Sequence, residues 1–588
     1  MSASFRTLLV SLPLCFACSA LALAQDGGAA EAPSDAGTAP AADGGGDAAP
    51  PANDPPPTLP EPEPQVPPPP PENAPAPPPP ALPPPSAADA ASEYGASAHA
   101  HRPGPGGYET YGTGSRFNVP LEEIPATVNV IDQQMLQEHG ALSVDQALFL
   151  EPGVTPIWEY GGFLHLSMRG FQALTLYDGV RDSRALLADS APQTGILDLD
   201  RLEVLRGPAS VLYGYGSVGG VVNLIHKSPS RDPHYELELG MGLPNQHIVH
   251  GGAQGPLGDL FSYRVDVGQV VHTDFRGAST ERNQATASLR FTPDRRDTFE
   301  LRGSISRDHY NTDVGIPTVE DPDHPGRYIV PSNVSLSNRY NTANDHIDYQ
   351  RIDLAASYRH DISDVTYLQA RLNFVDDHYA YSAAESLDYV APMDMTPAQV
   401  DRGYLSFARG WTPLTGQLEL HSEAHTGPLL HKLAVGYELD SFRGATDNQI
   451  ENGEMPNTVD YYHPVDLAPK ISQSNSSINH YRHITNSFYG FDHIHILDNL
   501  IVTGGLRGDL VNSRVRKEYV DPELGTDIAD PNTGAFRAPL RNHLASLTGQ
   551  GGIVFTPWSP LTAYVSYASS FTPIFISPSD KEPTNYSP

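Results

Sequence analysis

The sequence predicts a mostly β protein: a proline-rich tail, then a small α+β domain, then a large antiparallel β-barrel. Three observations predict this order. From about Asp232 apolar and polar residues alternate over segments of about ten residues, as in membrane-spanning barrel strands. Upstream, Asp198–Lys227 has the pattern of a strand, a turn, a short helix, a glycine-rich turn and a second strand. Between residues 25 and 101 there is no Lys and no Arg, only a tract rich in Ala, Gly, Pro and acidic residues.

The first 24 residues predict a secretory signal peptide. Arg6 precedes the apolar run Leu8–Leu23, and an A-x-A cleavage site follows. The alternative, a lipoprotein anchored through Cys18, is disfavoured because the residues before this cysteine fit a lipobox poorly. Cys15 and Cys18 are the two cysteines of the chain, so the mature protein is expected to contain no disulfide.

Residues 25–107 predict a disordered tail with polyproline II character, because they cannot bury enough apolar surface to offset ordering. A solvated tail and a partner-binding spacer are both compatible with this composition. The net charge of −34 over 588 residues excludes a nucleic-acid-binding protein, which needs a basic face. No later stretch approaches about 18 consecutive apolar residues, so no membrane-spanning helix is expected.

The α+β domain is expected to contain short elements separated by Gly and Pro. Asp132 is a candidate N-cap for a helix. The expected strands are Ile124–Ile131, Leu202–Leu205 and Val221–Ile225, and the expected helices are Gln133–His139, Ser143–Leu148 and Ala209–Leu212. Two segments, Thr155–His165 and Asp182–Thr194, are expected to be loops.

Gly214, Gly216 and Gly219 form a G-x-G-x-x-G pattern. A dinucleotide site needs a strand before the glycines and a helix after them, so that the helix N-terminus faces the pyrophosphate. The expected order here is the reverse, which argues against nucleotide binding.

Asp198–Lys227 closely resembles the end of the plug domain of TonB-dependent outer-membrane receptors. The matching residues are Glu203, Arg206, Gly207, Pro208, Leu212, Tyr213, Gly214, Gly219, Gly220 and Asn223. The resemblance continues through Arg169-Gly170 and Asp178-Gly179 and implies a plug at residues 117–229 and a barrel at 230–588. It also implies that Arg169 and Arg206, if buried, pair with carboxylates on the barrel wall.

The resemblance implies two functional segments. Residues 108–116 are similar to a TonB box, which adds a strand to the energising partner, and Glu109, Thr110, Tyr111 and Thr113 are its candidate coupling residues. In the family the apical loops of the plug face outward and touch the ligand. The candidate ligand-binding residues are Trp158, Tyr160, Phe163 and Arg184. The alternative is that these aromatic residues pack against the barrel wall.

The alternating segments predict apolar side chains outside the barrel and polar ones inside, whereas a soluble sandwich would have the reverse arrangement. Tight turns are expected at Pro293–Asp297 and Pro557–Pro560, and long extracellular loops at Arg307–Tyr349 and Asp440–Thr485. Roughly 13 or 14 strands can be counted by alternation, whereas the family barrel has about 22. The sequence is therefore expected to be C-terminally truncated, with a naturally smaller barrel as the alternative.

The resemblance implies energy-coupled uptake of a ferric siderophore across a Gram-negative outer membrane. Its implied partners are the siderophore, the TonB-ExbB-ExbD complex and outer-membrane lipid. No catalytic set is found, so no enzyme is expected, and no cofactor is expected because the siderophore carries the iron. Haem or vitamin B12 as ligand, a passive porin or adhesion barrel, and a secreted enzyme remain alternatives. His493 and His495 share one face of a strand and could meet a metal, although such pairs are more often polar lumen residues.

Overall fold

The computed structural model describes residues 113–573, except 150, 160–162, 183, 185–194, 244, 343, 393–396, 455–457, 466–469, 522–526, 530–535, 537 and 559–560. All described residues belong to one compact unit, Pro83–Pro588. The predicted signal peptide, the predicted tail and the candidate coupling residues Glu109, Thr110 and Tyr111 lie outside the described residues.

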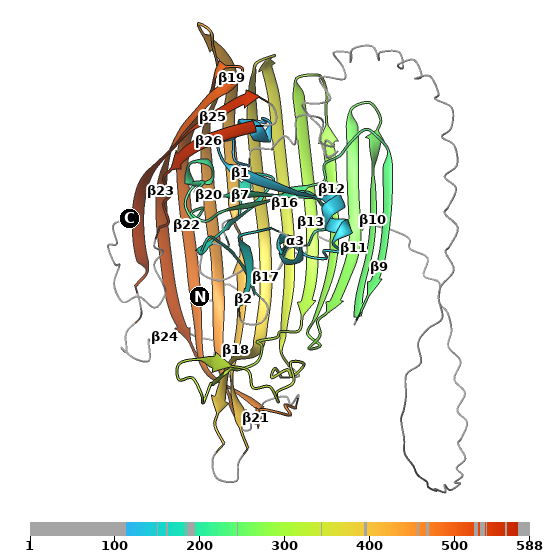
Figure 1. The fold of residues 1–588 in the computed structure, drawn as a ribbon, viewed down its shortest axis with the longest axis vertical. Coiled ribbons are helices and arrows are strands. Elements are labelled where there is room, and N and C mark those ends of the chain that lie inside the picture. Colours follow the sequence, from blue (N-terminus) through green and yellow to red (C-terminus); the bar gives the residue numbers. More distant parts are fainter. Residues whose placement is uncertain are drawn as a thin grey trace, which may run out of the picture. The chain divides into compact units, whose positions relative to one another are not determined.

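The plug is an α+β domain built from short elements (Figure 1). Its elements are η1 (Leu121–Glu123), β1 (Thr127–Asp132), α2 (Gln133–Glu138), α3 (Val144–Leu148), β2 (Val154–Glu159), β3 (Phe163–Met168), β4 (Phe171–Gln172), β5 (Leu174–Tyr177), β6 (Val180–Arg181), β7 (Leu199–Arg206), α4 (Ser210–Tyr213) and β8 (Gly220–His226). The central sheet has the order β1-β7-β8-β5-β6, and β2, β3 and β4 form a second, smaller sheet.

The long strands of the central plug sheet, β7 and β8, are buried along nearly their whole length, although β7 alternates aliphatic residues with charged ones such as Arg201 and Glu203. β7 pairs antiparallel with β1 and β8, whereas β5 pairs parallel with β8. The predicted helix 133–139 is confirmed as α2, and its predicted cap is also present. The Met135 backbone N–H donates to Asp132 Oδ1 at 2.9 Å, which satisfies one of the free donors of the first turn.

One predicted loop is wrong. The segment 155–165 was expected to lack strand structure, but β2 and β3 pair antiparallel from Val154↔Met168 to Glu159↔Phe163. The alternation that marks a strand is hidden here, because Pro156 and the aromatic residues interrupt the simple apolar–polar pattern.

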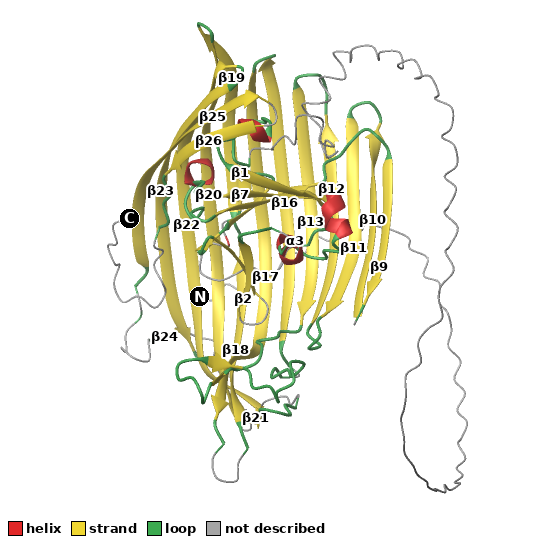
Figure 2. Cartoon of the chain, viewed as in Figure 1, coloured by secondary structure: helices red, strands yellow, loops and turns green. Residues whose placement is uncertain are grey.

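The long strands form one antiparallel sheet with the plug on one side of it (Figures 1 and 2). Its strands are β9 (His234–Gly242), β10 (Asn245–Leu257), β11 (Phe261–Thr273), β12 (Ser279–Phe291), β13 (Asp297–Tyr310), β16 (His346–Ser363), β17 (Thr366–Val390), β18 (Gln399–Trp411), β19 (Leu414–Thr426), β20 (Leu429–Glu454), β21 (Thr458–Asp460), β22 (Lys470–Leu497), β23 (Leu500–Val520), β24 (Asp527–Ile528), β25 (Leu540–Trp558) and β26 (Leu561–Ala568). The short strands β14 (Val319–Glu320) and β15 (Tyr328–Ile329) pair separately. Within the described part of the chain, β9 and β26 are the two edges of the large sheet.

β18 and β19 act as one strand with a break. Both pair with β17 on the same side, β18 through Asp377↔Trp411 and β19 through Phe374↔Leu414. The break falls at Pro413, which has no N–H to donate to the ladder. The continuous path through the sheet therefore has the order β26-β25-β23-β22-β20-β18-β17-β16-β13-β12-β11-β10-β9, which agrees with the strand number counted from the alternation.

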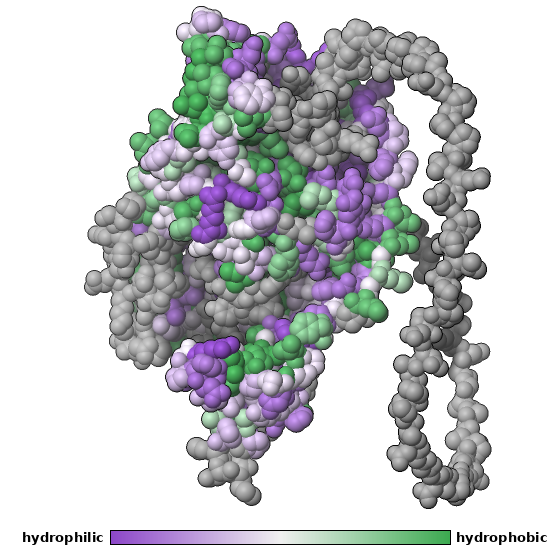
Figure 3. Space-filling model, viewed as in Figure 1, coloured by the Kyte–Doolittle hydropathy of each residue, from purple (hydrophilic) through white to green (hydrophobic). Residues whose placement is uncertain are grey.

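The two faces of the sheet differ as the alternation predicts. On β13, Leu301 is 59% exposed whereas its neighbour Arg302 is 7% exposed. The same contrast holds along other strands, as at Leu418 and Glu419 or Leu506 and Arg507. Figure 3, which looks onto the side where the plug lies, shows hydrophilic and hydrophobic residues interspersed. The polar face therefore meets the plug and the apolar face points away from it, which is the inside-out pattern of a membrane barrel.

The two ends of the sheet also differ. One end carries short connections, at residues 258–260, 292–296, 364–365, 427–428 and 498–499. The other end, at the bottom of Figure 1, carries longer ones such as the connection between β13 and β16. The predicted turn at Pro293–Asp297 is confirmed. The predicted loop Asp440–Thr485 is wrong in large part, because β20 and β22 pair from Leu430↔His495 to Glu454↔Lys470. The many polar residues at these ends of β20 and β22 hide the apolar–polar alternation that predicts a strand.

Among the described residues there is no helix of sufficient length and apolarity to cross a membrane.

Gly220 offers a test of how tightly the plug is packed. Its φ is +150°, and a Cβ at this position would lie 2.4 Å from the Leu205 carbonyl oxygen and 2.3 Å from the Met168 sulfur. Overpacking costs about 1–3 kcal/mol and a strained backbone about 1–3 kcal/mol more. We expect Gly220→Ala to lower the free energy of plug opening by about 2 kcal/mol or more, measured by hydrogen exchange of plug amides.

The matched control for this substitution is Gly251→Ala on β10, where an added Cβ would have nothing within 4 Å. We expect this variant to exchange like the wild type. Equal plug protection in both variants would contradict the packing described for β7 and β8.

Candidate functional site

Two plug signatures are tight hairpin turns. Arg169-Gly170 joins β3 to β4, and Asp178-Gly179 joins β5 to β6. All four residues have positive φ values, between +50° and +81°, as a two-residue type I′ turn requires. Asp tolerates this conformation and Gly adopts it without steric cost. The first role of these two residue pairs is therefore to reverse the direction of the chain between neighbouring strands.

Asp178 also connects the plug to the wall. Its carboxylate accepts hydrogen bonds from Arg302 Nη1 on β13 at 2.6 Å and from His226 Nδ1 at 2.9 Å. The His226 backbone N–H donates to the other carboxylate oxygen at 2.8 Å. Asn223 supports the same turn, because its Oδ1 accepts from the Gly179 N–H at 3.0 Å.

The prediction for the two plug arginines needs correction. Arg206 forms its ion pair with Glu151, which is a plug residue and not a wall residue. Arg169 is exposed, and none of the ion pairs among the described residues involves it. The wall carboxylates Glu419 and Asp377 instead pair with Arg116, which precedes the first plug strand, and with Arg184, which follows β6.

The remaining signature residues lie around α4. Glu203 on β7 is fully buried and accepts from Arg201 Nε at 2.8 Å. Gly207 follows β7 with a φ of +103°, and its N–H donates to the Gly219 carbonyl oxygen at 3.1 Å. Pro208 follows directly and precedes α4. Tyr213 ends α4 and is 1% exposed, and burial raises the pKa of its phenol above the ordinary value.

Gly214 caps α4 where the plug touches the wall. Its φ is +77°, and an added Cβ would lie 2.9 Å from Arg507 Nη2 on β23. Arg507 is itself fully buried and pairs with Glu438 at 2.6 Å and with Asp509 at 2.8 Å. A glycine is therefore needed here because a paired wall arginine occupies the space.

Arg116 fixes the start of the plug to the wall near the short-connection end. It forms an ion pair with Glu419 on β19 at 3.3 Å, and the two side chains are 3% and 2% exposed. It also donates to the Leu212 carbonyl oxygen and lies over the rings of Tyr213 and Tyr489. The Tyr489 hydroxyl donates to the same Glu419 oxygen at 3.0 Å. This network buries a charge pair and pairs Nη1 and Nη2 of Arg116, whereas its Nε has no hydrogen-bond partner in the described structure.

Arg184, a predicted ligand residue, makes the equivalent contact toward the other end. It is 1% exposed and pairs with Asp182 at 2.6 Å and with Asp377 on β17. The Tyr349 hydroxyl lies 3.0 Å from its Nη1. Burial alone would raise the pKa of Asp182, but the charge and hydrogen bonds of Arg184 outweigh it and hold the pKa below the ordinary value. Arg184 thus occupies a closed ion-pair network, and its predicted ligand contact stays a prediction.

Phe163, a second predicted ligand residue, is 1% exposed and packs against wall aromatics. Its ring centroid lies 5.5 Å from that of Tyr379, 5.4 Å from that of Tyr381 and 6.1 Å from that of Phe407. This contact is the alternative considered for the aromatic residues of this segment. Nothing is described of the Trp158 side chain or of Tyr160, so their predicted ligand contact also stays a prediction.

Thr113 is the one described residue among the candidate coupling residues. It is fully buried, and its Oγ1 accepts a hydrogen bond from Asn223 Nδ2 at 2.5 Å. The end of the candidate TonB box therefore packs inside the plug in this structure.

Sequence reasoning missed the wall side of the interface. Arg302, Asp377, Glu419 and Glu438 are buried charged residues on the polar face of the sheet. The alternation of apolar and polar residues already places Arg302 and Glu438 on that face. The same signal could have found Glu419, which lies between the exposed Leu418 and Leu420. Asp377 lies between Asp376 and His378, so the alternation does not mark it.

The Arg116–Glu419 pair gives a test of the interface. Removing one partner of a buried ion pair leaves an uncompensated charge and costs about 3–5 kcal/mol. We expect Glu419→Gln to lower the free energy of plug opening by about that amount, measured by hydrogen exchange, because Arg116 stays buried without its counter-charge. The double variant R116M/E419Q should recover much of the loss.

The control is Glu518→Gln, which breaks the partly exposed pair Arg516–Glu518 on β23. Exposed pairs contribute about 0–1 kcal/mol, so this change should have little effect on the plug. If Glu419→Gln and Glu518→Gln had equal effects, the Arg116 network would not anchor the plug.

Comparison with known proteins agrees with this geometry. The family described as TonB-dependent Receptor Plug Domain matches residues 120–221, and the family described as TonB dependent receptor-like, beta-barrel matches residues 283–585. The Ferrioxamine B receptor of Salmonella typhimurium (strain SL1344) is 24% identical over 364 residues, covering 60% of this chain and 50% of that protein. The Ferrichrome outer membrane transporter/phage receptor of Escherichia coli (strain K12) is 22% identical, covering 78% and 63%.

Solved structures show the same fold. The ferric-catecholate import receptor Fiu from E. coli K12 in its open form superposes with a TM-score of 0.65 at 21% identity, covering 78% of this chain and 71% of that one. The siderophore receptor PiuA from Acinetobacter baumannii gives 0.68 at 20% identity, covering 78% and 66%. The chain spans about half the length of the first of the curated relatives it matches. On the evidence of both family matches and of the plug-in-sheet architecture, the chain belongs to the TonB-dependent receptors of the outer membrane.

Proposed function

We propose that the protein takes up a ferric siderophore across the outer membrane in a step that needs energy from a partner. The observation that carries this proposal is the set of ion pairs between plug and wall: Arg116–Glu419, Arg184–Asp377 and Asp178–Arg302. Two of these pairs are buried, and in the third the Asp178 side chain is 40% exposed; together they hold the plug against the polar face of the sheet. A passive porin needs an open aqueous lumen, so this arrangement favours a gated transporter.

The ligand class is supported by aromatic side chains and an arginine toward the long-connection end, which we call the proposed siderophore surface and whose rings are buried between plug and wall in this structure. Tyr310, Tyr349, Tyr379, Tyr381 and Phe407 form one cluster with Phe163. The Arg409 guanidinium lies 4.5 Å from the centre of the Phe407 ring and donates to the Tyr379 hydroxyl at 2.7 Å. Aromatic faces with polar tips and a cation suit a flat, anionic iron chelate. Relatives named for ferrioxamine B, for ferrichrome and for catecholate siderophores support the same class.

In this proposal the protein supplies no iron ligands, since the siderophore surrounds the iron. The protein's own residues bind the chelate through contact with aromatic faces and through electrostatic attraction. The plug must then move so that the chelate can pass. Movement requires that plug–wall ion pairs break, and a buried pair is costly to break. That cost is the physical reason for an energy-coupling partner, which we propose to be the TonB-ExbB-ExbD complex.

The coupling segment is proposed to be residues 108–116, acting by strand addition to the partner. Strand addition relies on backbone hydrogen bonds. Because Thr113 is already fixed to Asn223 on β8, a pull on this segment would act directly on the central plug sheet. The proposed path of force therefore runs from the segment to β8 and on to the turn at Asp178-Gly179.

Thr110→Pro tests the coupling segment. Proline removes a backbone N–H and cannot complete a strand ladder. We expect cells that produce this variant to bind a ⁵⁵Fe-labelled siderophore at the surface like the wild type but to accumulate at least tenfold less iron. The panel should include ferrioxamine B, ferrichrome, a catecholate chelate, haem and vitamin B12.

A conservative Thr110→Ser variant is the matched control, and it should transport normally because it keeps the N–H. Normal accumulation by Thr110→Pro would place the coupling segment elsewhere. Binding of haem or vitamin B12, with no ferric siderophore bound, would overturn the proposed ligand class.

A further inference from the structure

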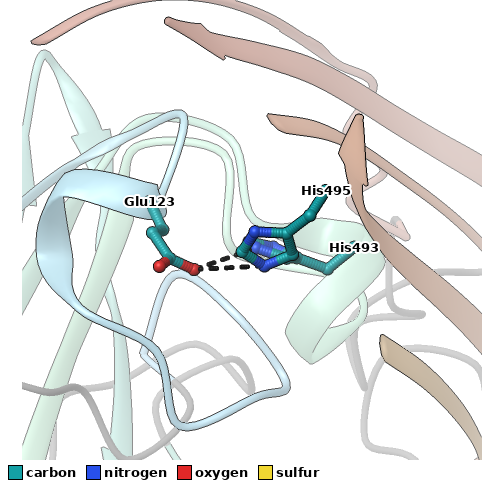
Figure 4. Close-up of side chains that lie close together, drawn as sticks. All are labelled: Glu123, His493 and His495. Carbon is teal, nitrogen blue, oxygen red and sulfur yellow. Dashed lines mark hydrogen bonds and ion pairs between the residues drawn. The ribbon is translucent and has the colours of Figure 1, made fainter. Parts of the chain in front are cut away.

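A cluster of two histidines and one carboxylate joins the plug to the sheet at the short-connection end. Glu123 ends η1, and His493 and His495 lie on the same face of β22, a few residues before the connection 498–499 (Figure 4). Both imidazoles point toward the Glu123 carboxylate, as the dashed lines of Figure 4 show. The sequence suggested the histidine pair but gave no third group, because Glu123 is 370 residues away.

The distances in this cluster match those around a small metal ion. His493 Nε2 lies 3.2 Å from Glu123 Oε2, and His495 Nε2 lies 3.6 Å from the same oxygen. The candidate ligand atoms of the three residues all lie within 4.8 Å of one another. Bonds of about 2.0–2.1 Å in a tetrahedral zinc site put ligand atoms about 3.3 Å apart. Small side-chain adjustments would therefore place one ion between all three groups.

The bonding of the cluster also suits a cation. His495 Nε2 is buried and has no hydrogen-bond partner in the described structure. A nitrogen lone pair in this position is available for a metal ion.

There is room for a further ligand. A small cavity of about 30 Å³ is lined by two of the three residues, Glu123 and His493, and by neighbours that include Arg116 and Asp492; His495 is not part of its lining. A single water needs roughly 10–15 Å³ of such space. A water could therefore complete four-coordination beside two imidazoles and one carboxylate, a ligand set typical of zinc.

In a second cluster of similar composition, the carboxylates are already paired with cationic side chains and are not available to a metal ion. Glu236, His250 and Asp266 also lie close together. There, however, Lys227 Nζ lies 2.8 Å from Glu236, and Arg264 pairs with both Glu236 and Asp266. These two cations already neutralise the carboxylates and occupy the space between them. Composition and proximity alone therefore do not distinguish the two clusters, whereas the neighbouring cations do.

We propose that Glu123, His493 and His495 bind one divalent transition-metal cation, with Zn²⁺ as the preferred ion, and that this ion links the start of the plug to β22. The site is separate from the proposed siderophore surface, since it lies at the opposite end of the sheet. It needs no iron and no siderophore. Its role is to hold η1 against the wall, close to the segment on which the partner is proposed to pull.

The test uses the full chain in detergent, purified through an affinity tag without histidine and freed of metal with EDTA. Zn²⁺ titration by calorimetry should show one tight site that is lost, or weakened at least tenfold, in His495→Gln and in Glu123→Gln. Co²⁺ serves as a spectroscopic probe: the wild type should develop the visible absorption of four-coordinate Co²⁺, and H493Q/H495Q should not. Circular dichroism of each variant checks that it is folded.

His250→Gln in the second cluster is the matched control and should bind Zn²⁺ like the wild type. The proposal is overturned if folded H493Q/H495Q binds the same number of Zn²⁺ ions with the same affinity as the wild type. It is also overturned if His250→Gln, and not the Glu123 cluster variants, removes the tight site. Neither result would affect the siderophore uptake assay, so the two proposals fail independently.

Discussion

Charged side chains that lose contact with water between plug and sheet must be paired, and this requirement determines how the two domains fit. An isolated buried charge costs far more free energy than a domain can supply, whereas a paired one is tolerated. Arg116, Arg184 and Arg302 each reach a carboxylate of the opposite domain. The charged groups on the polar face of the sheet thus determine where the plug lies and which residues of its loops contact the sheet. It also makes displacement of the plug unfavourable without an external force.

The sequence predicted the parts of this structure that depend on local chemistry. Strand alternation revealed the apolar outer face and the strand number, and Asp132 was identified as the cap of α2. The Asp178-Gly179 and Arg169-Gly170 pairs were found as signatures, and their positive φ values explain why those residue types are needed. The glycine pattern after α4 was rejected as a dinucleotide site, and the order α4 then β8 agrees.

What the sequence did not predict depends on long-range pairing. Arg206 was expected to meet the wall but pairs with Glu151, and no local pattern distinguishes these two partners. The sequence predicts loops where the hairpin β2–β3 and the extended ends of β20 and β22 lie, because polar and aromatic residues mask the two-residue period of a strand. It does not connect Glu123 with His493, because 370 positions separate the two residues. Contacts between residues hundreds of positions apart follow from the packing of the plug.

The structure separates two kinds of chemistry along the axis of the sheet. Toward the long connections, buried aromatic rings lie beside Arg409, and we propose that this cluster binds the anionic chelate. Toward the short connections, Arg116 and Glu123 tie the start of the plug to β19 and β22. The most direct test of the account is ⁵⁵Fe-siderophore uptake by cells that produce the protein, with and without the TonB-ExbB-ExbD complex. The account predicts unchanged surface binding and a loss of accumulation without the complex. Equal accumulation in both strains would contradict it.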